Sequence, residues 1–167
     1  IVLLKRTAGC VAPVFHITGS IPGFGPHMVS GAPLVLMHRF DAETTLRTIA
    51  ERRGTFMVAA STVYVALADH PALDRDAVSS LTKTLSGGAP VSQALVDRIV
   101  DRAGWRLRGA YGMTETNSPT HLGPVDHDPP VDPDSGALAV GVPVPGATYR
   151  IVDPETQTEN PEGKVGE

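Results

Sequence analysis

Five consecutive residues, Tyr111 to Glu115, combine an aromatic ring, a glycine, a hydroxyl group and a carboxylate. A tyrosine ring can stack on a nucleobase, and a glycine lets a ligand approach the backbone closely. A threonine hydroxyl can hydrogen-bond to a phosphate oxygen, and a glutamate can bind Mg²⁺. A string this short fits equally well a turn after a strand, in which Glu115 is only solvated. The segment alone leaves both interpretations open.

A second segment that could approach a ligand, Ser86-Gly-Gly-Ala-Pro90, occurs earlier in the chain. Its two glycines permit a tight turn, and Ser92 just behind them can cap a helix. Taken singly, the segment is better explained by such a turn than by a binding site. Its importance depends on whether the fold brings it beside Tyr111.

Hydrophobic patterns predict alternating strands and helices along most of the chain before Tyr111. Short apolar runs predict strands at 34–37, 55–59, 81–86 and 105–111. Helical spacing predicts helices from Asp41 to Gly54, from Ser61 or Thr62 through Leu67, and from Ser92 to Gly104, with the first residue of each as its N-cap. This alternation predicts the α/β class, with a mostly parallel, doubly wound sheet flanked by helices. Ligands bind such sheets at the carboxyl ends of the strands, where both segments described above would lie side by side.

The rest of the chain gives weaker patterns. Residues 16–31 have helical apolar spacing, but their glycines and prolines argue against a helix. A stretch rich in proline and aspartate occupies 117–135, and 148–153 then resembles a strand. We therefore expect an α/β unit over residues 1–136 and the start of a separate β unit over residues 137–167.

The stretch rich in proline and aspartate also contains residue types that bind metals. Asp132 and Asp134, followed by Gly136, resemble part of a calcium loop, but no glutamate follows at the required spacing. A solvated acidic loop is the better interpretation. We expect His121 and His127 to be ordinary loop residues.

Composition and charge exclude several classes of function. The 167 residues are 41% hydrophobic and 19% charged, which is ordinary for a globular domain and too polar for a membrane span. A net charge of -4 offers no counter-charge to a nucleic acid backbone, so nucleic acid is not an expected partner. The single cysteine, Cys10, cannot form an internal disulfide, and the first residues do not resemble a secretory signal. These features predict a protein of the reducing cytoplasm.

Five segments together resemble the adenylate-forming superfamily, which includes acyl-CoA synthetases, coumarate-CoA ligases, firefly luciferase and the adenylation domains of peptide synthetases. Segments 86–90 and 111–115 are similar to the paired adenine-binding segments of that family. The other three are Pro13-Val-Phe-His16 with Gly19, the run from Val58 to Tyr64, and Gly141-Val-Pro-Val-Pro-Gly146 with Arg150-Ile-Val-Asp153. In that order, they resemble the lining of the acyl tunnel, the segment beside the acyl pocket, and the start of a β-barrel subdomain. The resemblance thus implies that residues 137–167 begin that barrel.

The resemblance also implies roles for individual residues. Tyr111 would stack on adenine, Thr114 would contact the α-phosphate, Glu115 would bind Mg²⁺, and His16 would line the path of the acyl group and the thiol. Thr114, Glu115 and His16 are therefore the expected catalytic residues. The expected nucleotide site comprises Gly88, Ala89, Pro90, Gly109, Ala110, Tyr111, Gly112, Met113 and Thr114. The expected acyl pocket comprises Phe15, His16, Thr62, Val63, Gly87 and Gly112.

The reaction implied by the resemblance is attack of a carboxylate on the α-phosphorus of ATP, followed by capture of the acyl group by the thiol of coenzyme A. This predicts an AMP-forming acid-thiol ligase that uses ATP, Mg²⁺ and coenzyme A and acts on a fatty or aromatic acid. Two alternatives are an adenylation domain that feeds a carrier protein and a non-catalytic nucleotide-binding module. The family's phosphate loop ending in Pro-Lys-Gly and its C-terminal domain with a catalytic lysine do not occur in the sequence, and both chain ends resemble cut ends. We therefore expect an internal fragment of a larger enzyme that is inactive by itself.

Overall fold

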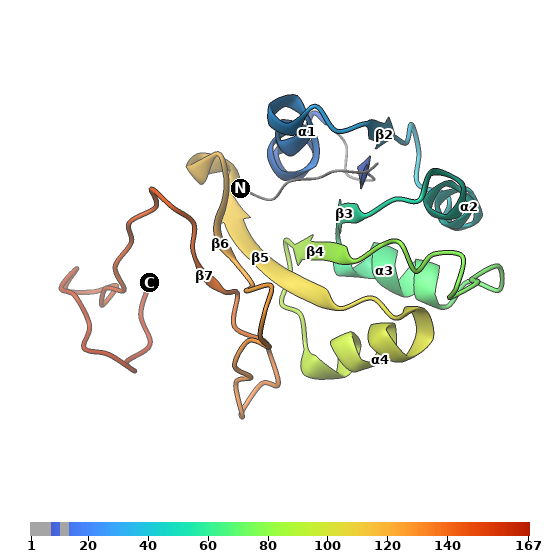
Figure 1. The fold of residues 1–167 in the computed structure, drawn as a ribbon. Coiled ribbons are helices and arrows are strands. Elements are labelled where there is room, and N and C mark those ends of the chain that lie inside the picture. Colours follow the sequence, from blue (N-terminus) through green and yellow to red (C-terminus); the bar gives the residue numbers. More distant parts are fainter. Residues whose placement is uncertain (1–7, 11–13) are drawn as a thin grey trace.

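The protein is built around one mixed sheet, which a computed structural model describes over residues 8–10 and 14–167 (Figure 1). The described residues form seven strands in the order β2-β1-β3-β4-β5-β6-β7. They are β1 (Ala8–Cys10), β2 (Leu34–Leu36), β3 (Phe56–Ala59), β4 (Lys83–Gly87), β5 (Leu107–Met113), β6 (Ser118–Leu122) and β7 (Val142–Pro143). All pairs from β2 to β5 are parallel, and the pairs β5–β6 and β6–β7 are antiparallel. The predicted α/β class with a mostly parallel sheet is confirmed.

Helices cover both faces of the sheet, as expected for a doubly wound fold. The helical elements are the π-helix η1 (Gly19–Phe24), α1 (Gly25–Ser30), α2 (Ala42–Arg52), α3 (Ser61–Ala68), α4 (Gln93–Ala103) and the 3-10 helix η2 (Thr114–Thr116). Helices α2, α3 and α4 pack side by side on one face, and η1 with α1 lies on the other (Figure 1). None of the described helices is both long and apolar enough to cross a membrane.

The main core lies between the sheet and α2, α3 and α4. Trp105, Tyr64 and Ile99 at its centre are at most 1% exposed. The Tyr64 hydroxyl lies 2.7 Å from the Met57 carbonyl on β3 and 3.1 Å from the Leu85 carbonyl on β4. Burial raises the pKa of the Tyr64 phenol, so the hydroxyl stays protonated and keeps donating. The tyrosine thus ties two neighbouring strands to α3.

Polar caps begin α2 and α4 where the sequence predicts them. The Asp41 carboxylate accepts a hydrogen bond from the Thr44 amide at 2.8 Å. The Ser92 hydroxyl accepts one from the Leu95 amide at 3.3 Å. Each cap satisfies an amide that has no partner inside its helix, which fixes the start of the helix. The predicted end of α4 at Gly104, in the left-handed conformation, is also confirmed.

Two predicted helix termini are wrong. Only Ala60 separates β3 from α3, so Ala60 occupies the N-cap position without a side-chain bond, and Ser61 and Thr62 lie inside the first turn. The second wrong prediction concerns the C-terminal end of α2. That helix ends at Arg53, which has the left-handed conformation (φ 50°, ψ 51°), one residue before the predicted Gly54. An L-residue in this conformation is strained because its Cβ approaches the backbone.

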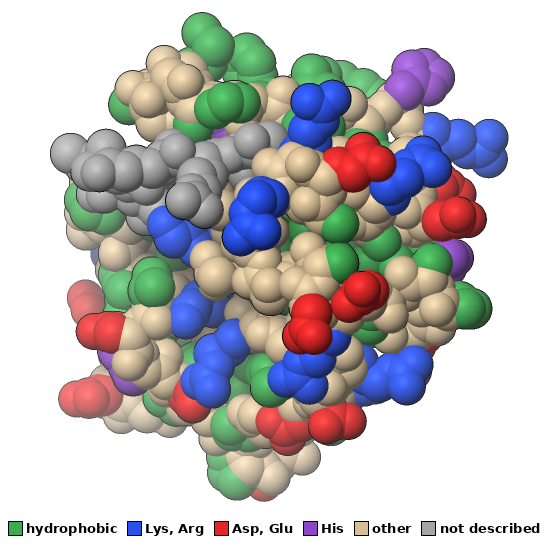
Figure 2. Space-filling view, turned by 45° about the vertical axis from the view of Figure 1, so that its right-hand side comes forward, with side chains coloured by type: hydrophobic (Ala, Val, Ile, Leu, Met, Phe, Trp, Pro, Cys, Tyr) green, Lys and Arg blue, Asp and Glu red, His purple; other side chains and the backbone are tan. Residues whose placement is uncertain are grey.

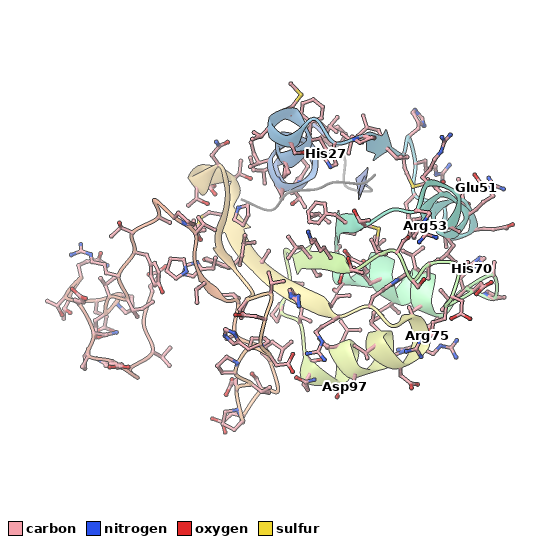
Figure 3. All side chains as sticks on the ribbon, viewed as in Figure 1. His27, Glu51, Arg53, His70, Arg75 and Asp97 are labelled. Atoms are coloured by element: carbon pink, nitrogen blue, oxygen red, sulfur yellow. The ribbon has the colours of Figure 1, made fainter. Side chains whose placement is uncertain are left out.

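We expect Arg53→Gly to raise the free energy of unfolding by about 0.5–1 kcal/mol, because glycine has no Cβ to strain. Arg53 is exposed at the C-terminal end of α2, so little packing is lost (Figure 3). Arg52→Gly, inside the helix, is the matched control and should destabilise by a similar amount. Urea denaturation followed by the fluorescence of Trp105, the only tryptophan, measures both. Lower stability of Arg53→Gly would contradict the assigned strain.

Residues 16–31, where the sequence left the structure ambiguous, form helices despite their glycines and prolines. They contain η1 and α1. Pro22 lies inside η1, and Pro26 is the second residue of α1, which follows η1 directly. The neighbouring amides keep helical acceptors, since those of Gly19 and Ser20 donate to the His16 carbonyl and that of Gly25 donates to the Ile21 carbonyl. The glycines and prolines therefore interrupt the helical hydrogen bonding too little to prevent the helices.

The chain after 105 also departs from the predicted pattern. The fourth predicted strand, 105–111, is β5, which reaches Met113, so the end of the strand itself contains Tyr111. The stretch rich in proline and aspartate contains β6, which sequence analysis did not predict. The expected strand at 148–153 is wrong, since the structure there has an isolated bridge between Val152 and Glu159. The division of the chain near residue 137 stays a prediction.

Basic and acidic side chains are interspersed on the face of the molecule seen in Figure 2. Among the exposed charged side chains of the protein, Arg98 pairs with Asp69 and Arg106 with Asp128. Such exposed pairs contribute little to stability. On this face, the residues that the structure describes therefore form no continuous basic surface of the kind that binds a polyanion.

Candidate active site

The carboxyl ends of β4 and β5 bring the two ligand-binding candidate segments together. Gly87 on β4 pairs with Ala110 on β5. A Cβ atom at residue 87 would come within 2.9 Å of the Ala110 carbonyl oxygen, so only glycine permits this approach of the strands. The prediction that the two segments share one edge of the sheet is confirmed.

A cleft opens at this edge between the η1 region and the sheet. It is lined by residues of η1, β3, β4, β5 and β6 and the chain next to them: Ile17, Thr18, Pro22, Val58, Leu85, Gly87, Gly88, Ala110, Tyr111, Gly112, Met113 and Pro119. None of these side chains carries a charge, and the cleft has a volume of about 50 Å³. A second cavity, with a volume of about 20 Å³, lies among core side chains that include Ile49 and Met57. The cleft at the carboxyl edge is therefore the better place for a ligand.

Strand β5 presents different residues to its two faces. Ala110 and Gly112 line the cleft, with Pro119 of β6 opposite Gly112. Tyr111 also borders the cleft, but side chains alternate along a strand, so its ring lies toward the other face from Ala110 and Gly112. There its ring centroid lies 5.8 Å from that of His121, and 46% of Tyr111 remains exposed. One strand thus separates an uncharged cleft from an aromatic surface on which a flat ligand can stack.

The chain beyond β4 turns at Gly88, whose φ of 83° favours glycine. Ala89 and Pro90 follow this turn and are exposed, on the way to the capped start of α4. Gly109, which the sequence also places in the nucleotide site, is buried within β5. Of the last two residues predicted for the nucleotide site, Met113 is the final residue of β5 and Thr114 is the first residue of η2.

Thr114 and Glu115 lie exposed in η2, directly after β5. The Thr116 hydroxyl donates to the Met113 carbonyl at 2.9 Å and holds this turn. Mg²⁺ is commonly bound through one or two protein carboxylates, with phosphate oxygens and water completing its coordination. Glu115, a single exposed carboxylate, fits that arrangement. Within the described residues no three His, Cys, Asp or Glu residues lie close enough together to hold a metal by themselves.

The other predicted acyl-pocket residues are not among those that line the cleft. Phe15 is 92% exposed, and His16 is exposed as well. The His16 Nδ1 accepts a hydrogen bond from the Thr18 amide at 3.2 Å. Thr62 and Val63 lie in the first turn of α3, just beyond the carboxyl end of β3. The roles of these residues stay predictions.

His121 is not the loop residue that the sequence predicts. It lies in β6 directly opposite Tyr111, and only 9% of it is exposed. Its Nδ1 lies 2.9 Å from the Thr120 hydroxyl, and its ring packs on the ring of Tyr149 with centroids 4.5 Å apart. His127, in contrast, lies exposed in a loop as predicted.

Comparison with known protein families shows to which family the chain belongs. Residues 4–167 match the family described as AMP-binding enzyme. The chain belongs to this family. The resemblance to adenylate-forming enzymes that the sequence motifs predict is thus confirmed at the level of the family.

Two relatives of this AMP-binding chain are plant ligases. It is 31% identical over 159 residues to 4-coumarate–CoA ligase 5 of Oryza sativa subsp. japonica, a match that covers 95% of this chain and 29% of that protein. It is 30% identical over 161 residues to 4-coumarate–CoA ligase 1 of Petroselinum crispum, again covering 95% and 29%. The chain therefore spans less than one third of the length of these relatives.

Solved structures of the same fold include two bacterial proteins. ATP-bound MatB from Rhodopseudomonas palustris matches with a TM-score of 0.83 at 26% identity, over 96% of this chain and 30% of that one. The amide bond synthetase McbA from Marinactinospora thermotolerans matches with a TM-score of 0.78 at 27% identity, over 99% of this chain and 32% of that one. Both support the α/β architecture described above.

Proposed function

We propose that the complete protein containing this chain is an AMP-forming ligase that activates a carboxylic acid with ATP and transfers the acyl group to coenzyme A. The observation that carries this proposal is the pairing of β4 with β5, which sets an uncharged cleft and an exposed tyrosine ring on opposite faces of β5. An acyl adenylate needs both surfaces, because it joins an acid tail to a flat purine. The relatives named as coenzyme A ligases support the choice of reaction.

The proposed reaction has two steps. A carboxylate oxygen of the acid bonds to the α-phosphorus of ATP and pyrophosphate leaves; the sulfur of coenzyme A then bonds to the acyl carbon and AMP leaves. Neither step requires a covalent bond to the protein, so positioning and charge stabilisation supply most of the lowering of the barrier. The protein's task is to hold the acid carboxylate in line with the α-phosphorus.

In this proposal, residues at the carboxyl ends of β4 and β5 contact different parts of the acyl adenylate. Tyr111 stacks on the purine, with Ala89 and Pro90 against its other side. The Thr114 hydroxyl donates to an oxygen of the α-phosphate. Gly112 has no side chain, so it leaves open the path from the cleft to that phosphate.

The remaining catalytic assignments are Glu115 and His16. Glu115 would hold Mg²⁺, which neutralises charge on the phosphate oxygens when it is bound. His16, exposed beside the helical segment that covers the cleft, would line the path of the acyl group and the thiol. The single cysteine supports placing this chemistry in the reducing cytoplasm.

The lining of the cleft favours an acid with an uncharged, apolar tail. Val58, Leu85 and Pro119 line it, and none of the described residues that line it carries a charge to pair with a second carboxylate or an amino group. An ionised group would lose hydration there without a partner. We therefore place aromatic and aliphatic monocarboxylic acids ahead of dicarboxylic and amino acids as substrates.

Tyr111→Ala in the complete protein should weaken binding of adenine nucleotides by about 1–3 kcal/mol, because one base-stacking partner is lost. Tyr111→Phe keeps the ring and should be nearly silent. Titration with AMP and with ATP measures both variants. If Phe is as damaging as Ala, the hydroxyl rather than the ring matters, and the stacking role is wrong.

An acid panel tests the proposed function as a whole. Acid-dependent exchange of pyrophosphate into ATP by the complete protein should occur with 4-coumarate, benzoate or fatty acids and not with malonate. Formation of the thioester should require coenzyme A. Adenylate formation without thioester would instead favour a carrier protein or an amine as acceptor. The 167-residue chain alone should show no exchange in the same assay, because it spans only 29% of its ligase relatives.

A further inference from the structure

Strand β6 carries an irregularity beside Tyr111 that the proposed chemistry does not explain. Tyr111 pairs with His121, but the next residue, Gly112, pairs with Pro119. Thr120 is therefore left without a partner on β5 and forms a β-bulge. The bulge reverses the alternation of side chains along β6, so that His121 shares the face of Tyr111 while Pro119 shares the cleft face of Gly112.

This arrangement places His121 between two tyrosine rings. Its ring centroid lies 5.8 Å from that of Tyr111 at an interplanar angle of 62°, and 4.5 Å from that of Tyr149 at 66°. Both contacts are edge-to-face, the favourable geometry for aromatic pairs. His121 is 9% exposed, whereas Tyr111 is 46% and Tyr149 is 53% exposed. The histidine is thus the buried centre of a three-ring array.

The bulge residue connects the His121 ring to the backbone of Tyr111. The Thr120 hydroxyl lies 2.9 Å from His121 Nδ1 and 3.4 Å from the Tyr111 carbonyl oxygen. A hydroxyl has one hydrogen, so when Thr120 donates to that carbonyl, Nδ1 must carry a proton and donate to Thr120. Both the ring and the backbone of Tyr111 therefore have a connection to His121.

We propose that His121 is a positioning residue for the nucleotide: it holds the Tyr111 ring in one orientation and leaves the exposed side of that ring free for a purine. The inference rests on the proposed stacking role of Tyr111. Tyr149 packs on the far side of His121, so the segment after β7 takes part in holding the nucleotide site. A fixed ring binds a base more tightly than a free one, since less rotational freedom is lost on binding.

Titration of the complete protein with the fluorescent nucleotide N-methylanthraniloyl-AMP tests this role. His121→Ala should raise the dissociation constant by about three- to tenfold, the effect of losing one aromatic pair. His121→Phe keeps a ring in the array and should bind within about twofold of the unmodified protein. In a Tyr111→Ala background, His121→Ala should add no further loss, because the ring that it positions is gone.

The double substitution separates positioning from a merely structural role, which would add its penalty whether or not Tyr111 is present. A thermal melt checks that each variant folds; if His121→Ala does not, Tyr149→Ala at the exposed end of the array takes its place in the same cycle. Unchanged affinity in the folded variant, or additive penalties, would overturn the inference. If Tyr111→Ala itself leaves affinity unchanged, the stacking role in the proposed function fails as well.

Discussion

Replacing Glu115 with alanine in the complete protein is expected to lower kcat/KM for adenylate formation by about 10²- to 10³-fold. The carboxylate is the residue proposed to hold Mg²⁺, and charge on the phosphate oxygens is greatest when the α-phosphorus is attacked. Glu115 is exposed in η2 and does not contribute to the core, so stability should change little. The rate of pyrophosphate exchange as a function of Mg²⁺ concentration measures the effect.

Glu51→Gln is the matched control for this experiment. Glu51 is exposed near the C-terminal end of α2, which leads to the start of β3 at the opposite edge of the sheet (Figure 3). Its substitution removes the same charge and should leave exchange within about twofold of the unmodified enzyme. Unchanged exchange by Glu115→Ala at saturating Mg²⁺ would show that this carboxylate does not hold the ion.

Gly112→Val should raise the KM for the acid by about 10- to 100-fold and leave the KM for ATP within about threefold. Gly112 lines the cleft opposite Pro119, so a branched side chain there would occupy the space proposed for the acid. The nucleotide would contact the other face of β5 and would lose little. Exchange kinetics with one substrate varied and the other saturating separate the two constants.

Two variants bracket the Gly112 experiment. Gly112→Ala adds a single methyl group and should give a smaller rise in the KM for the acid. Tyr111→Ala, one residue earlier on the opposite face, should show the reverse split, with the larger change in the KM for ATP. An equal rise in both constants for Gly112→Val would argue that β5 does not separate the acid from the nucleotide.

Local signals predicted the elements that depend on local interactions. Asp41 and Ser92 cap α2 and α4 because a polar side chain before an apolar helical pattern has nearby amides to satisfy. Gly104 ends α4 because glycine adopts the left-handed conformation freely. The prediction of Gly54 at the end of α2 failed by one residue, since the left-handed conformation occurs at Arg53.

Elements held by pairing with distant residues left no readable pattern. Strand β6 contains Pro119 and follows no regular alternation, because its bulge at Thr120 changes the face on which side chains lie. The sequence therefore could not show that His121 lies opposite Tyr111. The two ligand-binding candidate segments were predictable as neighbours, because parallel strands joined by one helix place their carboxyl ends at one edge.

The path of one carboxylate oxygen tests the proposed reaction most directly. The complete protein would be supplied with ATP, coenzyme A and 4-coumarate, or the most active acid of the panel, labelled with ¹⁸O in both carboxylate oxygens, and its products weighed by mass spectrometry. Attack of the carboxylate on the α-phosphorus predicts AMP that carries one ¹⁸O for each thioester formed, with the other ¹⁸O retained in the acyl group. Unlabelled AMP, or ADP as the nucleotide product, would contradict the formation of an acyl adenylate.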